Sequence, residues 1–190
     1  MMQKKIENIF RESVAVKGAT LIRNKLLIEK AVALLTKTFR LKKKLLIFGN
    51  GGSAADSQHL AAEFVGRFKR ERKGLPAIAL TTDTSALTAL GNDYTFDIIF
   101  ARQVEALGQK GDVAIGFSTS GRSRNVIEGL KTAKRLGLKT ISLTGRDGGP
   151  IAKLTDVSIV VPSNVTARIQ EAHLVTFHTI CELVEDQFAR

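Results

Sequence analysis

Short apolar runs alternate along the chain with longer segments in which apolar residues recur at helical spacing. The runs show no polar alternation, which is typical of strands buried on both faces of a parallel sheet. They fall at residues 45–48, 76–80, 112–118, 139–143 and 157–161. This pattern predicts an α/β fold, a three-layer αβα sandwich around a five-stranded parallel sheet.

The segments between the runs predict the helices. They cover about 53–67, 85–90, 96–107, 125–136 and 166–188, with a short helix starting at Pro150. Gly91-Asn-Asp93 is a turn signal that should end the second of these helices. The first forty residues predict two amphipathic helices interrupted near Gly18. We expect one domain over 1–190, with a helical segment at 1–44 and an α/β core at 45–190.

Length and composition favour a globular protein of the cytoplasm. The chain has 190 residues, of which 44 % are hydrophobic, and its mean hydropathy is +0.03. Its apolar runs are too short to cross a bilayer, and its N-terminus is charged and amphipathic, unlike a signal peptide. Cys181 is the only cysteine, which excludes an intrachain disulfide and fits a reducing compartment. We expect no membrane partner.

The net charge of +11 lies mostly in residues 1–44, which hold twelve Lys or Arg and three Glu. One interpretation is a basic tail for nucleic acid. The other is a solvated basic face on helices whose opposite face carries Ile28, Val32 and Leu35. The helical spacing favours the second interpretation, so no nucleic-acid partner is expected. The positive field would also attract an anionic substrate.

The stretch Leu45–Glu63 has the layout of an active site. A buried strand is followed by Gly49, Gly51 and Gly52, which permit a tight turn and close approach of a ligand. Ser53 can cap the next helix, so that its hydroxyl and the first free N–H groups point into one crevice. His59 and Glu63, four residues apart, share a face of that helix.

A second loop follows the third predicted strand. It holds four hydroxyls in six residues, at Ser118, Thr119, Ser120 and Ser123, just before a helix. Hydroxyls and unpaired N–H groups at the carboxyl ends of parallel strands form a cradle for phosphate. The alternative is an ordinary N-cap loop rich in Ser and Thr. Two such loops in one crevice favour a phosphorylated ligand.

A dinucleotide site is the competing interpretation of the first loop. Gly49-x-Gly51-x-x-Ala54 matches the G-x-G-x-x-A pattern after a strand. The acidic residue after the next strand is Asp83, about thirty residues beyond Gly51, whereas a spacing of roughly twenty is expected. The second hydroxyl loop also has no role in such a site, so this interpretation is the weaker one.

Two further side chains could join the first helix at a metal. Gln170 and His178 lie eight residues apart on the last predicted helix, about 80° apart around its axis. If that helix passes near His59 and Glu63, the four side chains could bind a metal, most commonly Zn²⁺. The alternative is that each histidine is a partly buried residue with satisfied hydrogen bonds.

Over essentially its whole length, the chain resembles the phosphoheptose isomerase family of SIS-domain proteins. The matching motifs are Gly49-Asn-Gly-Gly-Ser53, His59-x-x-x-Glu63, Gly91-Asn-Asp93, Ser118-Thr-Ser-Gly-x-Ser123, Leu143-Thr-Gly-x-Asp-Gly-Gly149, Arg168-Ile-Gln-Glu171 and His178. The resemblance implies a flavodoxin-like αβα fold with the N-terminal helices at an oligomer interface. It also implies a homotetramer with active sites between subunits.

The activity implied by the resemblance is aldose–ketose isomerisation. Sedoheptulose 7-phosphate would become D-glycero-D-manno-heptose 7-phosphate through an enediol, the first step toward the heptose of the lipopolysaccharide core. Glu63 matches the base and His178 its acid–base partner, with one Zn²⁺ per subunit. The implied zinc ligands are His59, Glu63, Gln170 and His178. The implied substrate-binding residues are Asn50, Gly51, Gly52, Ser53, Glu63, Asn92, Asp93, Ser118, Thr119, Ser120, Ser123 and Gln170.

A non-catalytic role is the alternative within the same fold. Some SIS-domain proteins associate with the bacterial replication initiator, and others bind phosphosugars as regulatory modules. This chain keeps both Glu63 and His178, which favours the enzyme. Arg122 and Arg124 in and after the hydroxyl loop are less expected in the family.

Overall fold

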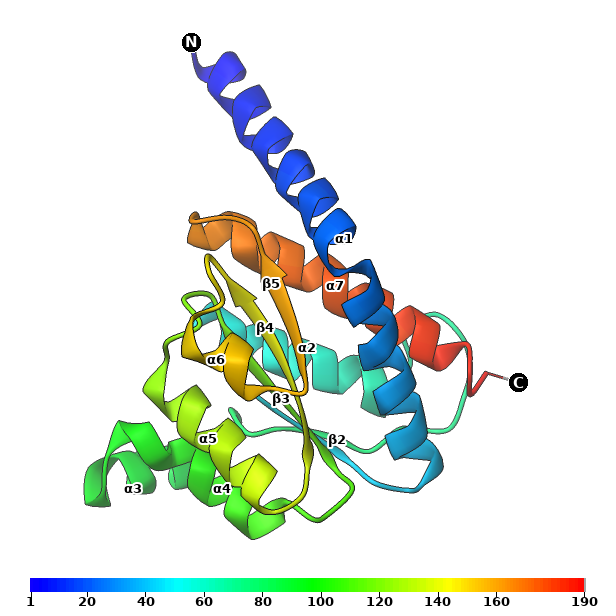
Figure 1. The fold of residues 1–190 in the computed structure, drawn as a ribbon, viewed down its shortest axis with the longest axis vertical. Coiled ribbons are helices and arrows are strands. Elements are labelled where there is room, and N and C mark those ends of the chain that lie inside the picture. Colours follow the sequence, from blue (N-terminus) through cyan, green and yellow to red (C-terminus); the bar gives the residue numbers. More distant parts are fainter. Residues whose placement is uncertain (190) are drawn as a thin grey trace.

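The computed structural model describes residues 1–189, in which strands and helices alternate as predicted (Figure 1). The strands are β1 (Leu45–Phe48), β2 (Ala77–Ala79), β3 (Val113–Ser118), β4 (Lys139–Gly145) and β5 (Val157–Val161). All pairings are parallel, in the order β2-β1-β3-β4-β5. This flavodoxin-like order confirms the predicted αβα sandwich with a five-stranded parallel sheet.

Helices cover both faces of this sheet (Figure 1). One face carries α1 (Met2–Arg40), α2 (Gly52–Val65) and α7 (Thr166–Glu185). The other carries α4 (Ile99–Leu107), α5 (Arg124–Arg135) and α6 (Gly149–Leu154). The exposed helix α3 (Thr84–Asp93) leads into α4 through a 3₁₀ turn at Phe96–Ile98.

Strand β1 shows why the apolar runs lack polar alternation. Leu45 and Ile47 pack into the core beneath α1, α2 and α7, whereas Leu46 and Phe48 pack into the core beneath α4 and α5. The Phe48 ring stacks on Phe100 with centroids 5.1 Å apart. Both faces of the central strand are therefore dry, as the sequence pattern predicted.

The predicted interruption at Gly18 is wrong, because α1 is one helix of 39 residues. A lone glycine costs a helix about 1 kcal/mol relative to alanine, which is too little to break it. The first two turns of α1 extend beyond the body (Figure 1), and the Arg168 guanidinium of α7 donates to the Ile9 carbonyl that follows them. Among the described residues, none of the helices, α1 included, has the length and apolar character needed to cross a membrane.

Two other local predictions also fail at glycines. The N-cap of α2 is Gly51, at φ +57°, and Ser53 lies inside the first turn, donating its N–H to the Asn50 carbonyl. The glycine turn thus starts the helix before Ser53 can cap it. Helix α3 likewise continues through Gly91 to Asp93. Gly91-Asn-Asp93, which was predicted to end the helix, instead forms its last helical turn.

One side chain of α1 completes the sheet at its β5 edge. The Asn24 amide nitrogen donates to the Val160 carbonyl at 3.0 Å, and the Val160 N–H donates to the Asn24 side-chain oxygen at 3.1 Å. Asn24 is buried. It therefore satisfies two backbone groups of the edge strand as a neighbouring strand would.

His173 ties α7 to the centre of the sheet. Its Nε2 lies 3.1 Å from the Thr144 carbonyl, and its Nδ1 is buried without a hydrogen-bond partner among the described residues. Complete burial lowers the pKa of His173 to about 4, although the Thr144 bond acts in the opposite direction. The ring is therefore neutral at pH 7, with its proton on Nε2.

Because the unfolded chain protonates this histidine near pH 6.5, acid should destabilise the fold through it. Between about pH 6.5 and 4 the unfolded state binds the extra proton, so this contribution falls by about 3 kcal/mol. We predict that the free energy of unfolding in urea drops less on acidification in His173→Gln, which keeps a donor for Thr144 but does not titrate. Equal pH dependence in both proteins would contradict the prediction.

Candidate active site

The two predicted ligand loops meet at the point where the strand order reverses. β1 and β3 are neighbours in the sheet, so the loops that follow them flank this switch point. Asn50 and Asn125 join the loops through reciprocal amide hydrogen bonds of 2.9 and 2.8 Å. Sequence analysis missed Asn125, although its place directly after the hydroxyl loop was a signal.

The hydroxyl loop is held in a tight turn by its own side chains. Ser118 Oγ lies 2.9 Å from Ser123 Oγ, and Ser120 Oγ accepts the Arg122 N–H at 3.2 Å. Thr119 lies beside them, partly buried. The loop ends at the start of α5, so hydroxyls and helix N–H groups lie together. This arrangement suits an anion such as phosphate.

The loop after β4 packs against this turn. Gly121 has φ +68°, and a Cβ there would collide with the carbonyl of Gly148. Arg122 reaches the same loop, where its guanidinium donates to the Asp147 carboxylate at 2.6 Å. The unexpected Arg122 is therefore paired with an acidic residue.

Three of the predicted metal ligands converge between α2 and α7. His59 Nε2 lies 2.9 Å from Glu63 Oε1 on α2, and His178 Nε2 on α7 lies 3.3 Å from His59 Nε2. One ligand atom from each of the three residues lies within 4.8 Å of the other two. We call these residues the triad. The sequence left open whether these two helices meet, and the structure shows that they do.

Aromatic rings pack against the triad, which remains partly exposed to solvent. The ring centroid of Phe177 is 5.3 Å from that of His59, and the centroid of Phe68 is 5.2 Å from that of His178. The side chains of His59 and Glu63 remain 43 % and 20 % exposed, so a ligand can reach them. Burial, followed by the charge of His59, lowers the pKa of His178, against the opposing effect of Glu63.

The fourth predicted ligand, Gln170, lies between the same two helices but away from the triad. Its amide nitrogen packs against Gly52, where a Cβ would collide with it. Gly52 faces Gln170 and His59 faces His178, so α2 and α7 run parallel. The seven residues from Gly52 to His59 span about 10 Å of helix. Gln170 therefore lies at the glycine-loop end, about two turns from His178.

Asn92 and Asp93 lie in the last turn of α3, exposed to solvent. The Asn92 amide donates to the Asp93 carboxylate at 2.9 Å, and within residues 1–189 neither side chain bonds to the other predicted site residues. The following 3₁₀ turn approaches the hydroxyl loop, because Asp97 and Arg124 form an ion pair at 3.6 Å.

Asp56 is a further carboxylate of α2 that sequence analysis missed. Its Oδ2 is buried without a hydrogen-bond partner in the described part of the chain. Burial raises the pKa of Asp56 to about 6, although His59 counteracts this rise. Asp56 precedes His59 by three residues and Glu63 by seven, a helical spacing that could have revealed it.

The triad fits zinc in both chemistry and spacing. Two histidines and one glutamate are a ligand set of catalytic zinc sites, which keep a fourth position open. Ligands at tetrahedral positions about 2.0–2.1 Å from zinc lie roughly 3.3 Å apart, which matches the separation of the two imidazole nitrogens.

Comparison with known proteins identifies the family. The sequence profile of the SIS domain matches residues 10–145. A phosphoheptose isomerase of Aquifex aeolicus is 56 % identical over 185 residues, 97 % of each chain. Another, of Aliarcobacter butzleri, is 59 % identical over 162 residues, 85 % of this chain and 86 % of the relative.

A solved structure gives the same result. The phosphoheptose isomerase of Neisseria gonorrhoeae superposes with a TM-score of 0.93 at 46 % identity, covering 98 % of this chain and 100 % of the other. With relatives so similar over nearly the full length, the chain belongs to the phosphoheptose isomerase family of SIS-domain proteins.

Proposed function

We propose that this aldose–ketose isomerase converts sedoheptulose 7-phosphate into D-glycero-D-manno-heptose 7-phosphate with Glu63 and His178 as its acid–base pair. The reaction begins the supply of heptose for the lipopolysaccharide core. The observation that carries the residue assignment is the meeting of Glu63, His59 and His178 between α2 and α7. A non-catalytic role would require neither the carboxylate nor the imidazole there.

The separation of the two subsites supports this substrate. The phosphate on C7 would bind to Ser53, Ser118, Thr119, Ser120 and Ser123 and to the backbone at Asn50, Gly51 and Gly52. The reacting carbons, C1 and C2, are at the opposite end of the sugar. The triad lies about 10 Å farther along α2, as a molecule extended in this way requires. Asn92, Asp93 and Gln170 would contact the hydroxyls between.

Two proton transfers complete the isomerisation. The Glu63 carboxylate takes a proton from C1 of the ketose, which leaves an enediol, and returns it to C2. His178 moves a second proton from the oxygen on C1 to the oxygen on C2. Its lowered pKa keeps the ring neutral near pH 7, so Nε2 can accept and then donate in the state in which it does not hold the metal.

The proposed cofactor is one Zn²⁺ per subunit, held by His59, Glu63 and His178. Bound there, zinc would supply Lewis-acid stabilisation of negative charge on the sugar oxygens. We keep Gln170 as a substrate contact, since the ligand role implied by the resemblance requires its amide to leave Gly52 and approach the triad.

The acid–base roles predict a large loss of turnover without unfolding. Glu63→Gln and His178→Ala should each lower kcat at least about a hundredfold, with unchanged circular dichroism. Conversion of sedoheptulose 7-phosphate is followed by NMR. Glu71→Gln, at an exposed carboxylate beyond α2, is the control and should keep normal turnover. Normal kcat in either site variant would refute the role of that residue.

The metal proposal predicts reversible inactivation by chelators. Treatment with a chelator should lower activity, and added Zn²⁺ should restore it. His59→Ala should weaken zinc binding, measured by competition with a chromogenic chelator, because it removes one of three ligands. If a preparation proved metal-free by elemental analysis is fully active, zinc is not essential, and Glu63 and His178 act as a plain acid–base pair.

We further propose a homotetramer that acts in the cytoplasm. Large apolar side chains are exposed along the first 26 residues of α1, namely Ile6, Ile9, Phe10, Val14, Leu21, Ile22 and Leu26. A groove of about 670 Å³ between α1 and α7 is also mostly apolar, with Ile28, Val32 and Leu183 in its wall. Such surfaces on one chain favour association with further copies.

Sedimentation velocity should therefore find a tetramer at micromolar concentration. Phe10→Glu places a charge on the exposed apolar face of α1 and should shift the population toward smaller species. Asn8→Glu changes the charge of a neighbouring position without removing apolar area and should leave the tetramer intact. A stable monomer of the wild-type chain would overturn the proposal.

A further inference from the structure

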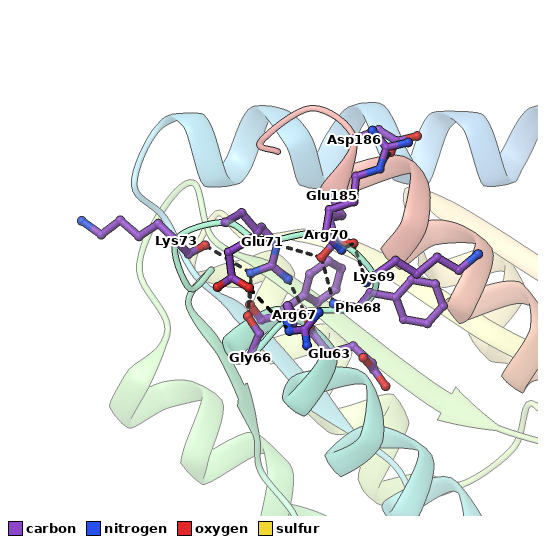
Figure 2. Close-up of polar contacts among 12 residues, drawn as sticks. Glu63, Gly66, Arg67, Phe68, Lys69, Arg70, Glu71, Lys73, Glu185 and Asp186 are labelled. Atoms are coloured by element: carbon purple, nitrogen blue, oxygen red, sulfur yellow. Dashed lines mark hydrogen bonds and ion pairs between the residues drawn. The ribbon is translucent and has the colours of Figure 1, made fainter. Parts of the chain in front are cut away.

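The loop between α2 and β2 is held by one carboxylate. Residues 66–74 form neither helix nor strand. Glu185, the last residue of α7, accepts three backbone N–H groups from this loop, those of Phe68, Lys69 and Arg70, at 2.8, 2.7 and 2.8 Å (Figure 2). The loop is therefore fastened to the C-terminal end of α7.

Arg72 fastens the same loop to α2. Its guanidinium donates to the carbonyls of Glu63 and Phe64 at 2.7 and 2.8 Å, two carbonyls that the end of α2 leaves without helical partners. Its Nε lies 3.3 Å from Glu185 Oε1, and both side chains are buried, at 1 % and 2 % exposure. Arg72 and Glu185 thus join the ends of the two helices that carry the triad.

The connection reaches the triad from both sides. On α2, the residue whose carbonyl Arg72 holds is Glu63 itself. On the other side, the loop residue Phe68, whose N–H is held by Glu185, packs its ring on His178 with centroids 5.2 Å apart. A shift of the loop would therefore move the support of His178 relative to Glu63.

Burial of this ion pair is costly, so stability alone does not account for it. Pairing two buried charges commonly contributes no more to stability than apolar residues of similar size. Burial opposes ionisation of Glu185, but the bonds from Lys69, Phe68 and Arg70, with the charge of Arg72, hold its pKa below the ordinary value. The carboxylate is thus ionised at pH 7, and its bonds keep the loop in place.

We infer that Arg72 and Glu185 are positioning residues that set the approach of His178 to His59 and Glu63, and so the affinity of the triad for a divalent metal. The inference about affinity rests on the proposed metal role of the triad. The inference about geometry concerns the apoprotein as well, which allows the two to be tested separately.

The experiment compares three variants with a matched control. Glu185→Gln removes the negative charge and places an amide donor opposite the backbone N–H groups that Glu185 accepts. Arg72→Lys keeps a positive charge but loses the several donors of the guanidinium. Phe68→Leu removes only the aromatic ring that packs on His178. The control is Asp112→Asn, at an equally buried carboxylate that accepts the Lys44 and Gln109 N–H groups before β3. It reports general destabilisation, measured as the change in Tm.

Two readouts are taken on the full chain. The first is the NMR shift of the His178 ring proton in the apoprotein, assigned by its loss in His178→Ala and sensitive to the Phe68 ring. The second is the Kd for Zn²⁺ from competition with a chromogenic chelator. We expect the shift to move in all three variants. The Kd should rise about 10- to 100-fold in Glu185→Gln and Arg72→Lys, and it should also rise in Phe68→Leu. Asp112→Asn should change neither.

The outcomes separate the two proposals. An unchanged His178 shift in folded Glu185→Gln and Arg72→Lys overturns the positioning role, whatever the zinc result. Wild-type protein that binds no zinc refutes the metal site and the affinity part of the inference, while the shift still tests the geometry. If neither charge variant folds, Phe68→Leu decides through the Kd alone, because loss of the ring moves the shift directly, and an unchanged Kd there overturns the inference.

Discussion

The candidate site depends on the burial of one ring, that of Phe177. It is fully buried and packs edge-on against Phe117 of β3 and against His59 of α2. Because neighbouring residues of a helix point about 100° apart, burying Phe177 under α7 turns His178 sideways, toward α2. The geometry of the triad is thus a consequence of core packing.

Local patterns sufficed for most of the secondary structure. β1 and β5 have the bounds expected from their apolar runs, and the sheet follows from strands that alternate with helices. The failures occur at Gly18, Gly91 and Ser53, where a residue with a strong local preference was given too much weight. At Gly18 packing of the rest of α1 outweighed a preference of about 1 kcal/mol, and at Ser53 a more permissive glycine next to it did so. The exposed helix α3 continues through Gly91 without such packing.

The site residues also differ in how far local patterns predicted them. His59 and Glu63 could be paired from the sequence because four residues on one helix fix their neighbourhood. The sequence could say only that His178 would join them if the two helices met, because His59 and His178 are 119 residues apart in the chain. Asn125 was missed for a related reason. Its partner Asn50 is 75 residues away and leaves no local pattern.

The pairing of polar groups in the site bears on how it selects its ligand. Ser118 bonds to Ser123, and Asn50 bonds to Asn125, so these groups are satisfied before any substrate arrives. A neutral sugar hydroxyl would exchange one such bond for another of similar strength and gain little. A phosphate dianion forms charge-assisted bonds, roughly twice as strong, with the same hydroxyls and with the N–H groups of the α5 start. The self-paired loop is therefore suited to discriminate by charge, in favour of phosphorylated sugars over free ones.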